Sequence, residues 1–166
     1  MNQKFDIKIF DSTDLISQKW VDFENVSFYH CFQSFDWVDH WLSTIGKKLN
    51  YNPQFVFVMT EENQILMILP LAIKRTFNFK MLCWVGGDYG CGLFSKDFYE
   101  KINKKSFLWI WKEILKKIKR YDIIYLSSQP FLINSFENPF IKYLNCYPHH
   151  SLSHQIAIDG DWKSLK

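Results

Sequence analysis

The sequence predicts an α/β fold: a mixed, mainly antiparallel sheet with helices on both of its faces. The first observation is the order of the patterns, which change between the two-residue period of strands and the 3.6-residue period of helices. They give a strand, two helices, three strands, and then helix, strand, helix and strand. The second observation is that three consecutive strands imply an antiparallel meander, whereas the later alternation implies crossovers that place helices on both faces.

The composition supports one folded domain. The chain has 166 residues, of which 48% are hydrophobic and 19% aromatic, so its apolar surface is ample to offset the entropy of ordering. This excludes a disordered or low-complexity protein. The formal net charge is +3, and the densest basic cluster, residues 112–120, is interleaved with apolar residues at helical spacing. That pattern favours a solvated helix face over a nucleic-acid groove.

The sequence carries no targeting, membrane or metal signal. Its first residues lack the apolar core of a signal peptide, and no run approaches the roughly 18 to 20 apolar residues of a membrane span. We therefore expect a cytoplasmic protein without a membrane span. Because the cysteines show neither a CxxC pair nor metal-ligand spacing, we expect free thiols and no metal at Cys31, Cys83, Cys91 and Cys146.

A strand and two helices are expected first. Residues 5–10 alternate apolar and polar side chains, as in a strand, and residues 11–14 offer capping oxygens for a helix that ends near Val26. The apolar face of that helix is formed by Ile16, Trp20 and Phe23. Ser34 is the expected N-cap of the second helix, in which apolar residues repeat at helical spacing until Gly46.

A meander of three strands follows. Residues 53–59 and 65–73 read as two strands joined by the polar turn 61–64, which predicts an antiparallel hairpin. Pro70 cannot donate a ladder hydrogen bond, so it implies a bulge or an unpaired position in the second strand. Residues 81–85 form the third strand, which extends the hairpin to a meander.

A glycine-rich stretch, WVGGDYGCGLF, comes next at residues 84–94 and leads towards a helical region over residues 97–119. Ser95 or Asp97 is expected to cap that region, and the pattern leaves open whether it holds one helix or two. The remaining expected elements are a short buried strand over 122–127, a helix over 137–144, a strand over 153–158 and the beginning of a helix over 161–166.

The element order resembles that of the GNAT superfamily of N-acetyltransferases, in which the sheet splays between the fourth and fifth strands to admit an acyl-CoA. CFQSFDWVDHW (31–41), ILPLAIKR (68–75) and GGDYGCGLF (86–94) are similar to the CelD/BcsL-type acetyltransferases, relatives of the Fem-type peptidyltransferases. The resemblance implies that residues 1–158 are the first of two GNAT-like domains in one polypeptide and that residues 159–166 begin the second.

The same resemblance implies an acyl transfer from acetyl-CoA or another acyl-CoA to an amine or hydroxyl of a saccharide or cell-envelope metabolite. In GNAT enzymes the loop after the fourth strand binds the CoA pyrophosphate through backbone N–H groups. The family pattern falls on Gly87, Gly90 and Gly92, with Gly87 where the family has Gln or Arg. The carboxylate of Asp88 would oppose a diphosphate in the same turn. We therefore expect the loop to keep its turn geometry and to lack the CoA contact.

Four residues are candidates for contact with the acceptor. Asp88 and Tyr89 lie on the loop at the end of a central strand, where open α/β sheets bind ligands. Gln33 and Trp37 open the second helix, which commonly walls the acceptor site in GNAT folds. A purely structural role stays open for all four, and no residue is identifiable as a catalytic base. Two functions remain: the N-terminal domain of an acyltransferase, or a GNAT-like binding module without an acyl-CoA site.

Overall fold

The computed structural model describes residues 4–86 and 89–148. In chain order the elements are β1 (Phe5–Phe10), α1 (Ser17–Glu24), β2 (Ser27–Phe28), the 3-10 turn η1 (Cys31–Gln33), α2 (Phe35–Trp41), the π-helical turn η2 (Leu42–Gly46), β3 (Tyr51–Thr60), β4 (Ile65–Thr76), β5 (Phe79–Trp84), β6 (Leu93–Ser95), α3 (Lys96–Lys101), α4 (Lys104–Lys117), β7 (Ile123–Ile124), β8 (Leu132–Ile133), β9 (Phe136–Glu137) and α5 (Pro139–Tyr143).

The main sheet confirms the predicted fold class. Its strands follow the order β1-β3-β4-β5-β7, and the short strands β2 and β6 pair beside this path. All pairings are antiparallel except that of β5 with β7, which is parallel over Met81–Ile123 and Leu82–Ile124. The fourth and fifth strands of the path, β5 and β7, pair only over this short stretch, and it is between these strands that the GNAT resemblance expects the sheet to splay.

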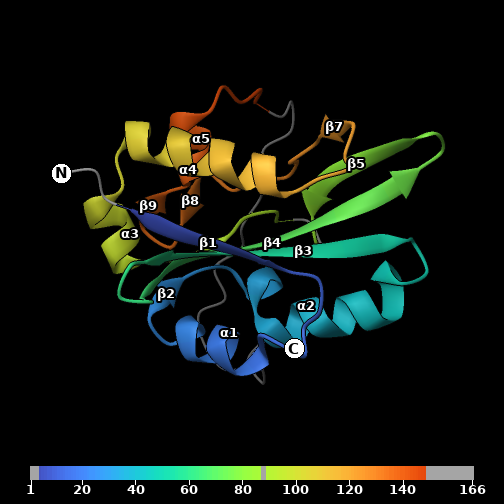
Figure 1. The fold of residues 1–166 in the computed structure, drawn as a ribbon, viewed down its shortest axis with the longest axis horizontal. Coiled ribbons are helices and arrows are strands. Elements are labelled where there is room, and N and C mark those ends of the chain that lie inside the picture. Colours follow the sequence, from blue (N-terminus) through green and yellow to red (C-terminus); the bar gives the residue numbers. More distant parts are fainter. Residues whose placement is uncertain (1–3, 87–88, 149–166) are drawn as a thin grey trace, which may run out of the picture.

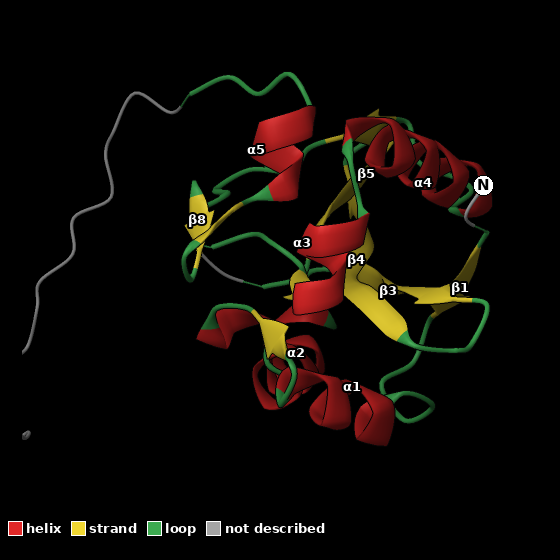
Figure 2. Cartoon of the chain, turned by 90° about the vertical axis from the view of Figure 1, so that its left-hand side faces the viewer, coloured by secondary structure: helices red, strands yellow, loops and turns green. Residues whose placement is uncertain are grey.

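Helices cover both faces of the sheet, and each face has its own core. In Figures 1 and 2, α1 and α2 lie on one face, whereas α4 and α5 lie on the other. Trp20 and Val38, on α1 and α2, pack with Phe55 and Phe57 of β3 on the first face. The larger core on the second face joins α4 and α5 to β4 and β5, and its fully buried aromatic side chains are Phe94, Phe98, Phe107 and Phe140.

The first elements agree with the predicted boundaries within a few residues, but one cap was predicted wrongly. The buried face of α1 is formed by Ile16, Trp20 and Phe23, as expected. The N-cap position of α1 is Ile16, whose side chain has no oxygen that could cap the helix. The hydroxyl of Thr13, one of the expected capping groups, instead donates its proton to Asp39 Oδ1 on α2 (2.6 Å). Ser34 caps α2 by accepting the N–H of Trp37, as predicted.

The antiparallel hairpin β3–β4 is confirmed, and Pro70 occupies an interrupted position of the sheet. Pro70 stays in register with Phe55, so it makes no bulge. On the side of β4 away from β3, the partner strand changes near Pro70. Leu71 is the first residue of β4 that pairs with β5, whereas Ile68 is the last that pairs with β6. The carbonyl of Pro70 accepts the N–H of Val85 (2.8 Å), and the N–H that proline lacks faces this interruption.

The glycine-rich stretch does not lead directly into a helix, contrary to the prediction. It leaves the sheet after β5 and returns as β6, which pairs with β4 and β2 before α3 begins. Thus β5 and β6 pair with the same side of β4, one after the other along its length. The glycine-rich stretch is the loop that connects them, and we call this loop the excursion. Two helices, α3 and α4, fill the helical region, and Ser95 caps α3 by accepting the N–H of Phe98.

The last part of the described chain differs most from the predictions. The predicted buried strand over 122–127 is the two-residue β7 at the end of the strand path, and its side chains Ile123 and Ile124 are exposed among the described residues. The predicted helix over 137–144 is shorter, and the hairpin β8–β9 precedes it. The elements predicted over 153–166 lie outside the described residues. No helix in the described ranges has the length and apolar character needed to cross a membrane.

Candidate functional site

The region where β5 and β7 diverge is occupied by the chain's own backbone. We call Trp84, Gly90 and residues 127–128 the splay region. Tyr125 still donates its N–H to Leu82 O of β5 (2.9 Å), but beyond it the two strands separate. Gly90 bridges the separated segments by donating its N–H to Ser128 O (2.9 Å). A Cβ on Gly90 would lie 2.7 Å from Ser127 O, so only glycine fits between these segments.

Aromatic rings fill the same region from the side of α4 and α5. The ring of Trp84 lies against Gly90 and packs edge-on against Phe140, with the ring centroids 5.2 Å apart. Phe140 is fully buried and also packs edge-on against Phe107 (5.3 Å) and Trp111 (5.2 Å) of α4. The place where the GNAT resemblance expects the acyl-CoA is therefore packed with protein atoms.

Two of the predicted cofactor-binding glycines, Gly90 and Gly92, lie where neighbouring atoms leave no room for a Cβ. Gly92 is buried, and a Cβ there would lie 2.9 Å from Ile68 O and 2.5 Å from Leu69 Cδ2. Gly90 is buried too, and its N–H is used within the protein. Gly86, at the start of the excursion, has φ +53° and rests on the ring of Trp41. Gly87 and Asp88 lie outside the described residues.

Gln33 connects the first and third of the three sequence motifs that carry the resemblance. Its side chain is 1% exposed, donates from Nε2 to Tyr89 O (2.6 Å) and accepts the thiol proton of Cys91 at Oε1 (3.0 Å). The carbonyl of Gln33 accepts the indole N–H of Trp20 (3.2 Å). Gln33 thus fastens residues 89–91 to the start of α2 and does not itself face solvent.

We predict that Gln33→Leu lowers the free energy of unfolding by about 2 kcal/mol, because it leaves the part-buried carbonyl of Tyr89 without its donor. Chemical denaturation of both proteins measures the difference. Gln18→Leu, which loses only an exposed bond to Asp22 on α1, is the matched control and is expected to change the value by less than about 0.5 kcal/mol. Equal losses in the two variants would show that the contact with Tyr89 contributes nothing.

A row of aromatic rings leads from this buried contact to the surface of α2. The ring of Tyr89 stacks on Phe32 (5.8 Å between centroids, 2° between planes), and Phe32 meets Trp37 edge-on (5.0 Å). His30 lies at the other side of Tyr89 (5.3 Å), with its Nε2 3.2 Å from Leu132 O. The structure therefore brings together three of the predicted residues, Gln33, Trp37 and Tyr89, around Phe32.

A groove of about 890 Å³ runs along the outer side of α2. Its apolar part is made by Trp37, which is 41% exposed, together with Trp41 and Ile45. Its polar lining consists of Cys31, Ser34, Asp36, Asp39, His40 and Thr44. We call these nine residues the α2 groove. A mainly apolar floor with a few polar groups is typical of small-molecule sites.

The π-helical turn η2 shapes the far end of the α2 groove. A π-helical turn has one more residue between its hydrogen-bonded groups than an α-helical turn, so the side chains after Trp41 are rotated around the helix axis. Trp37 and Ile45 belong to the apolar residues that repeat at helical spacing, but both are exposed, and Val38 is the buried residue of α2. Asp39 is held in place by the hydroxyl of Thr13, whereas the hydroxyl of Thr44 donates to His40 O (2.6 Å).

Glu24 supports the start of α2 beside the groove. Its Oε1 accepts the N–H of Phe35 (2.5 Å), and its Oε2 lies 3.5 Å from the hydroxyl of Tyr29. Burial of the carboxylate is the main cause that raises the pKa of Glu24 above its ordinary value, and the nearby charge of Asp36 acts in the same direction. This contact could not be inferred from the sequence pattern, since Glu24 lies on α1 and its partner Phe35 begins α2.

Cys91 is fully buried between the two loop glycines, and burial raises the pKa of its thiol to about 12. The thiol therefore stays protonated at neutral pH and is a poor nucleophile. Cys83 is also buried, whereas Cys31 and Cys146 are exposed. We predict that iodoacetamide modifies Cys31 and Cys146 in the native protein and reaches the other two only after unfolding, as peptide mass spectrometry would show. Rapid native modification of Cys91 would contradict this packing.

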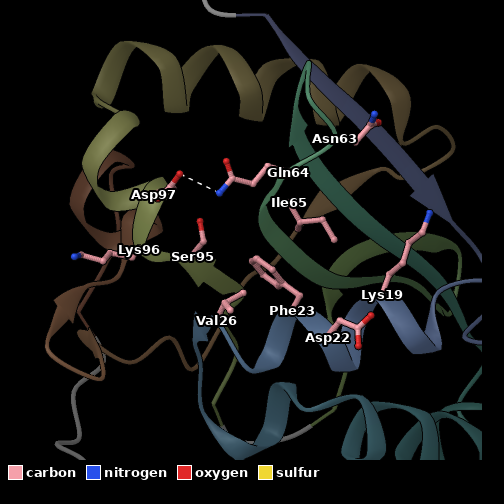
Figure 3. Close-up of a pocket in the computed structure, with 10 residues that line it drawn as sticks. All are labelled: Lys19, Asp22, Phe23, Val26, Asn63, Gln64, Ile65, Ser95, Lys96 and Asp97. Atoms are coloured by element: carbon pink, nitrogen blue, oxygen red, sulfur yellow. Dashed lines mark hydrogen bonds between the residues drawn. The ribbon is translucent and has the colours of Figure 1, made fainter.

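A second hollow, of about 430 Å³, lies between α1, the β3–β4 turn and the start of α3 (Figure 3). Gln64 Nε2 donates to Asp97 Oδ2 across it (3.0 Å), and Lys101 Nζ also donates to that carboxylate (2.5 Å). Lys96, on its rim, lies 3.5 Å from Glu100. Its charged groups on α3 are thus paired with neighbours, and none of the predicted site residues lines it.

Comparisons with known proteins leave the family open. No protein-family model matches the chain, and no curated protein matches it. One solved structure, described as a possible acetyltransferase from Clostridium difficile 630, aligns over 94% of this chain and 99% of its own, with 12% identity and a TM-score of 0.46. A likeness of that size carries no weight for function, so the fold assignment rests on the strand order itself.

Proposed function

We propose that this chain is a GNAT-like domain that binds the acceptor of an acyl transfer and holds no acyl-CoA of its own. The observation that carries the proposal is the bond from Gly90 to Ser128 in the splay region, together with the packing of Trp84 on Phe140. An acyl-CoA in that region would have to break this backbone bond and displace buried rings. Both changes cost free energy, because a buried N–H group without a partner and a buried ring without its packing are destabilising.

The α2 groove is the proposed acceptor site. Trp37 offers an exposed ring that can cover one face of a sugar, and Ser34, Asp36 and His40 offer donors and acceptors for its hydroxyl or amine groups. The row from Trp37 through Phe32 to Tyr89 would extend the same surface towards the glycine-rich excursion. A saccharide or another polar cell-envelope metabolite suits this mixture of ring and polar groups.

In this proposal a second GNAT-like domain supplies the acyl donor. The acceptor nitrogen or oxygen attacks the thioester carbonyl, the new C–N or C–O bond forms, the C–S bond breaks, and the CoA thiol leaves as the acceptor loses its proton. The present domain would hold the acceptor in the orientation for attack, which is a large part of the rate in such reactions. No described residue is assigned as the base.

Calorimetric titration of acetyl-CoA into the chain tests the donor half of the proposal. The expected result is no saturable heat, with circular dichroism confirming that the protein is folded. Saturable micromolar binding would overturn the proposal and restore the alternative in which this domain has its own acyl-CoA site.

NMR titration tests the acceptor half with glucosamine and glucose as probes. The expected result is a shift of the indole N–H signals of Trp37 and Trp41, which is abolished by Trp37→Ala. Trp109, which is 46% exposed on α4, provides the matched control: Trp109→Ala should leave the shifts unchanged. Shifts that avoid both groove indoles, or that persist in Trp37→Ala, would contradict the placement of the acceptor.

A further inference from the structure

The tip of the β4–β5 hairpin exposes aromatic side chains in an unusual way. Phe77 is 92% exposed, and Phe79 is 38% exposed. Phe77 also has φ +47°, in the left-handed region that bulky residues rarely adopt. An exposed phenylalanine contributes nothing to the core, and asparagine or glycine would suit this turn better. The tip therefore combines a backbone conformation and a solvent exposure that are both unfavourable for the side chain present.

Basic residues surround this tip. The register of the sheet places Lys74 beside Tyr51 and Arg75 beside Lys80. The N–H of Asp122 donates to Lys80 O (2.8 Å), which brings the end of the α4–β7 connection to the same place. The segments that meet here carry seven cations, of which Lys74, Arg75 and Lys80 are on the hairpin, Lys47 and Lys48 precede Asn50, and Lys119 and Arg120 precede Asp122. The carboxylate among them, Asp122, accepts the N–H of Lys80 (2.7 Å).

Further apolar side chains lie next to the hairpin. The N–H of Arg75 reaches Asn50 O (3.5 Å), so the loop that follows η2 runs beside the hairpin. Leu49, on that loop, is 45% exposed. Figure 1 shows the hairpin and this loop projecting together at the end of the sheet where β3 begins. We call Leu49, Phe77, Phe79 and the seven cations the hairpin surface.

We propose that the hairpin surface docks the protein on an anionic lipid bilayer. Phe77 and Leu49 would enter the headgroup region, and the cations would lie against the lipid phosphates. Exposed apolar tips ringed by Lys and Arg have the charge and polarity that bind such an interface, and long basic side chains can reach the phosphates. Each cation near an anionic bilayer strengthens binding about fivefold.

The same surface suits nucleic acid less well. Single-stranded nucleic acids are held in a basic groove whose aromatic rings accept stacked bases. Phe77 instead protrudes at the tip of a hairpin. The proposal is independent of the acceptor site, since no residue of the hairpin surface lines the α2 groove.

Vesicle flotation tests the proposal with the full chain. Vesicles of phosphatidylcholine, alone or mixed with phosphatidylglycerol, are the probes. The protein is expected to float with the mixed vesicles, to stay behind with the neutral ones, and to be released as the salt concentration rises above about 0.15 M. Phe77→Ser should reduce the partition coefficient about tenfold. The double variant Arg75→Gln with Lys80→Gln should reduce it about 25-fold.

Matched controls lie elsewhere on the molecule. Leu15→Ser changes an apolar side chain that is 69% exposed near α1, and Lys104→Gln with Lys105→Gln removes two exposed charges at the start of α4. Both should leave the partition coefficient within about twofold of the parent value. Thermal melting checks that every variant is folded.

Three outcomes would overturn the proposal. The first is the absence of binding to the mixed vesicles. The second is an equal loss in the control charge variant, which would mean that net charge alone drives the binding. The third is tighter binding to a single-stranded RNA that is weakened by the same hairpin variants, which would assign the surface to nucleic acid.

Discussion

Phe140→Ala is expected to lower the free energy of unfolding by about 4 kcal/mol, the largest effect of any single substitution considered for this chain. Phe140 is fully buried on the short helix α5 and packs edge-on against Trp84, Phe107 and Trp111. Removing its ring leaves a cavity between α4 and the sheet, because the facing rings come from rigid elements that can collapse only partly. Urea denaturation of the parent and variant measures the loss.

Phe131→Ala is the control for that prediction. Phe131 is the same residue type only nine positions earlier, but its ring is 62% exposed. Its change in stability is expected to stay within about 0.5 kcal/mol. A loss below about 1 kcal/mol for Phe140→Ala would show that α5 does not pack on the sheet in solution.

Gly90→Ala is expected to cost about 3 kcal/mol. The new methyl group would lie 2.2 Å from Trp84 Cδ1 and 2.7 Å from Ser127 O. The obstacle is serious because one of these atoms belongs to the backbone and the other to a ring that is itself packed on Phe140. Either the bond from Gly90 to Ser128 breaks or the ring of Trp84 moves, and denaturation midpoints measure the cost.

Gly46→Ala is the matched control for the glycine prediction. A methyl group there would lie 2.9 Å from Leu42 Cδ2 and 2.9 Å from Trp41 Cζ3, which belong to side chains alone. We expect a cost of about 1 kcal/mol. If both variants lose the same stability, the close backbone approach at Gly90 is absent in solution.

The sequence predicted the elements whose signals are local. The strand β1, the cap of Ser34 on α2 and the hairpin β3–β4 follow from periodicity, capping chemistry and a polar turn, which depend on neighbouring residues. The strand order follows from the succession of these elements. The two-residue strands β2, β8 and β9 could not be predicted, because so short a segment contains no measurable period and forms only where a partner strand is already in place. The strand β7 was predicted, but as a longer and buried one.

The candidate site was predicted only in part, for a similar reason. Gln33, Trp37 and Tyr89 do lie near one another, but nothing in their spacing reveals that Gln33 is buried or that Phe32 joins the other two rings. The return of the excursion as β6 was missed because its apolar residues can equally begin a helix. Asp36 and His40 of the α2 groove are four residues apart on one helix face, which is a signal that sequence alone could have used.

The occupied splay region indicates a packing role for the glycine-rich stretch in place of phosphate binding. Glycines after the fourth strand of the path suggest a phosphate loop, but here Gly90 and Gly92 allow the backbone to pass close to Ser127 and Ile68. The excursion then joins both faces of the fold: Gln33 holds it from the side of α2, and Trp84 holds it from the side of α5. In our proposal, the domain keeps the strand order that the GNAT resemblance implies, and its own side chains occupy the place of the acyl donor.

Hydrogen exchange at the amide of Gly90 tests the closure of the splay region most directly. Its N–H donates to Ser128 O, and the N–H of Tyr125, which donates to Leu82 O, provides a reference between the same two segments. The predicted result is slow exchange at Gly90, comparable to that at Tyr125 and unchanged by acetyl-CoA. Exchange as fast as that of the exposed turn at residues 61–62, or protection that appears only when acetyl-CoA is added, would contradict it.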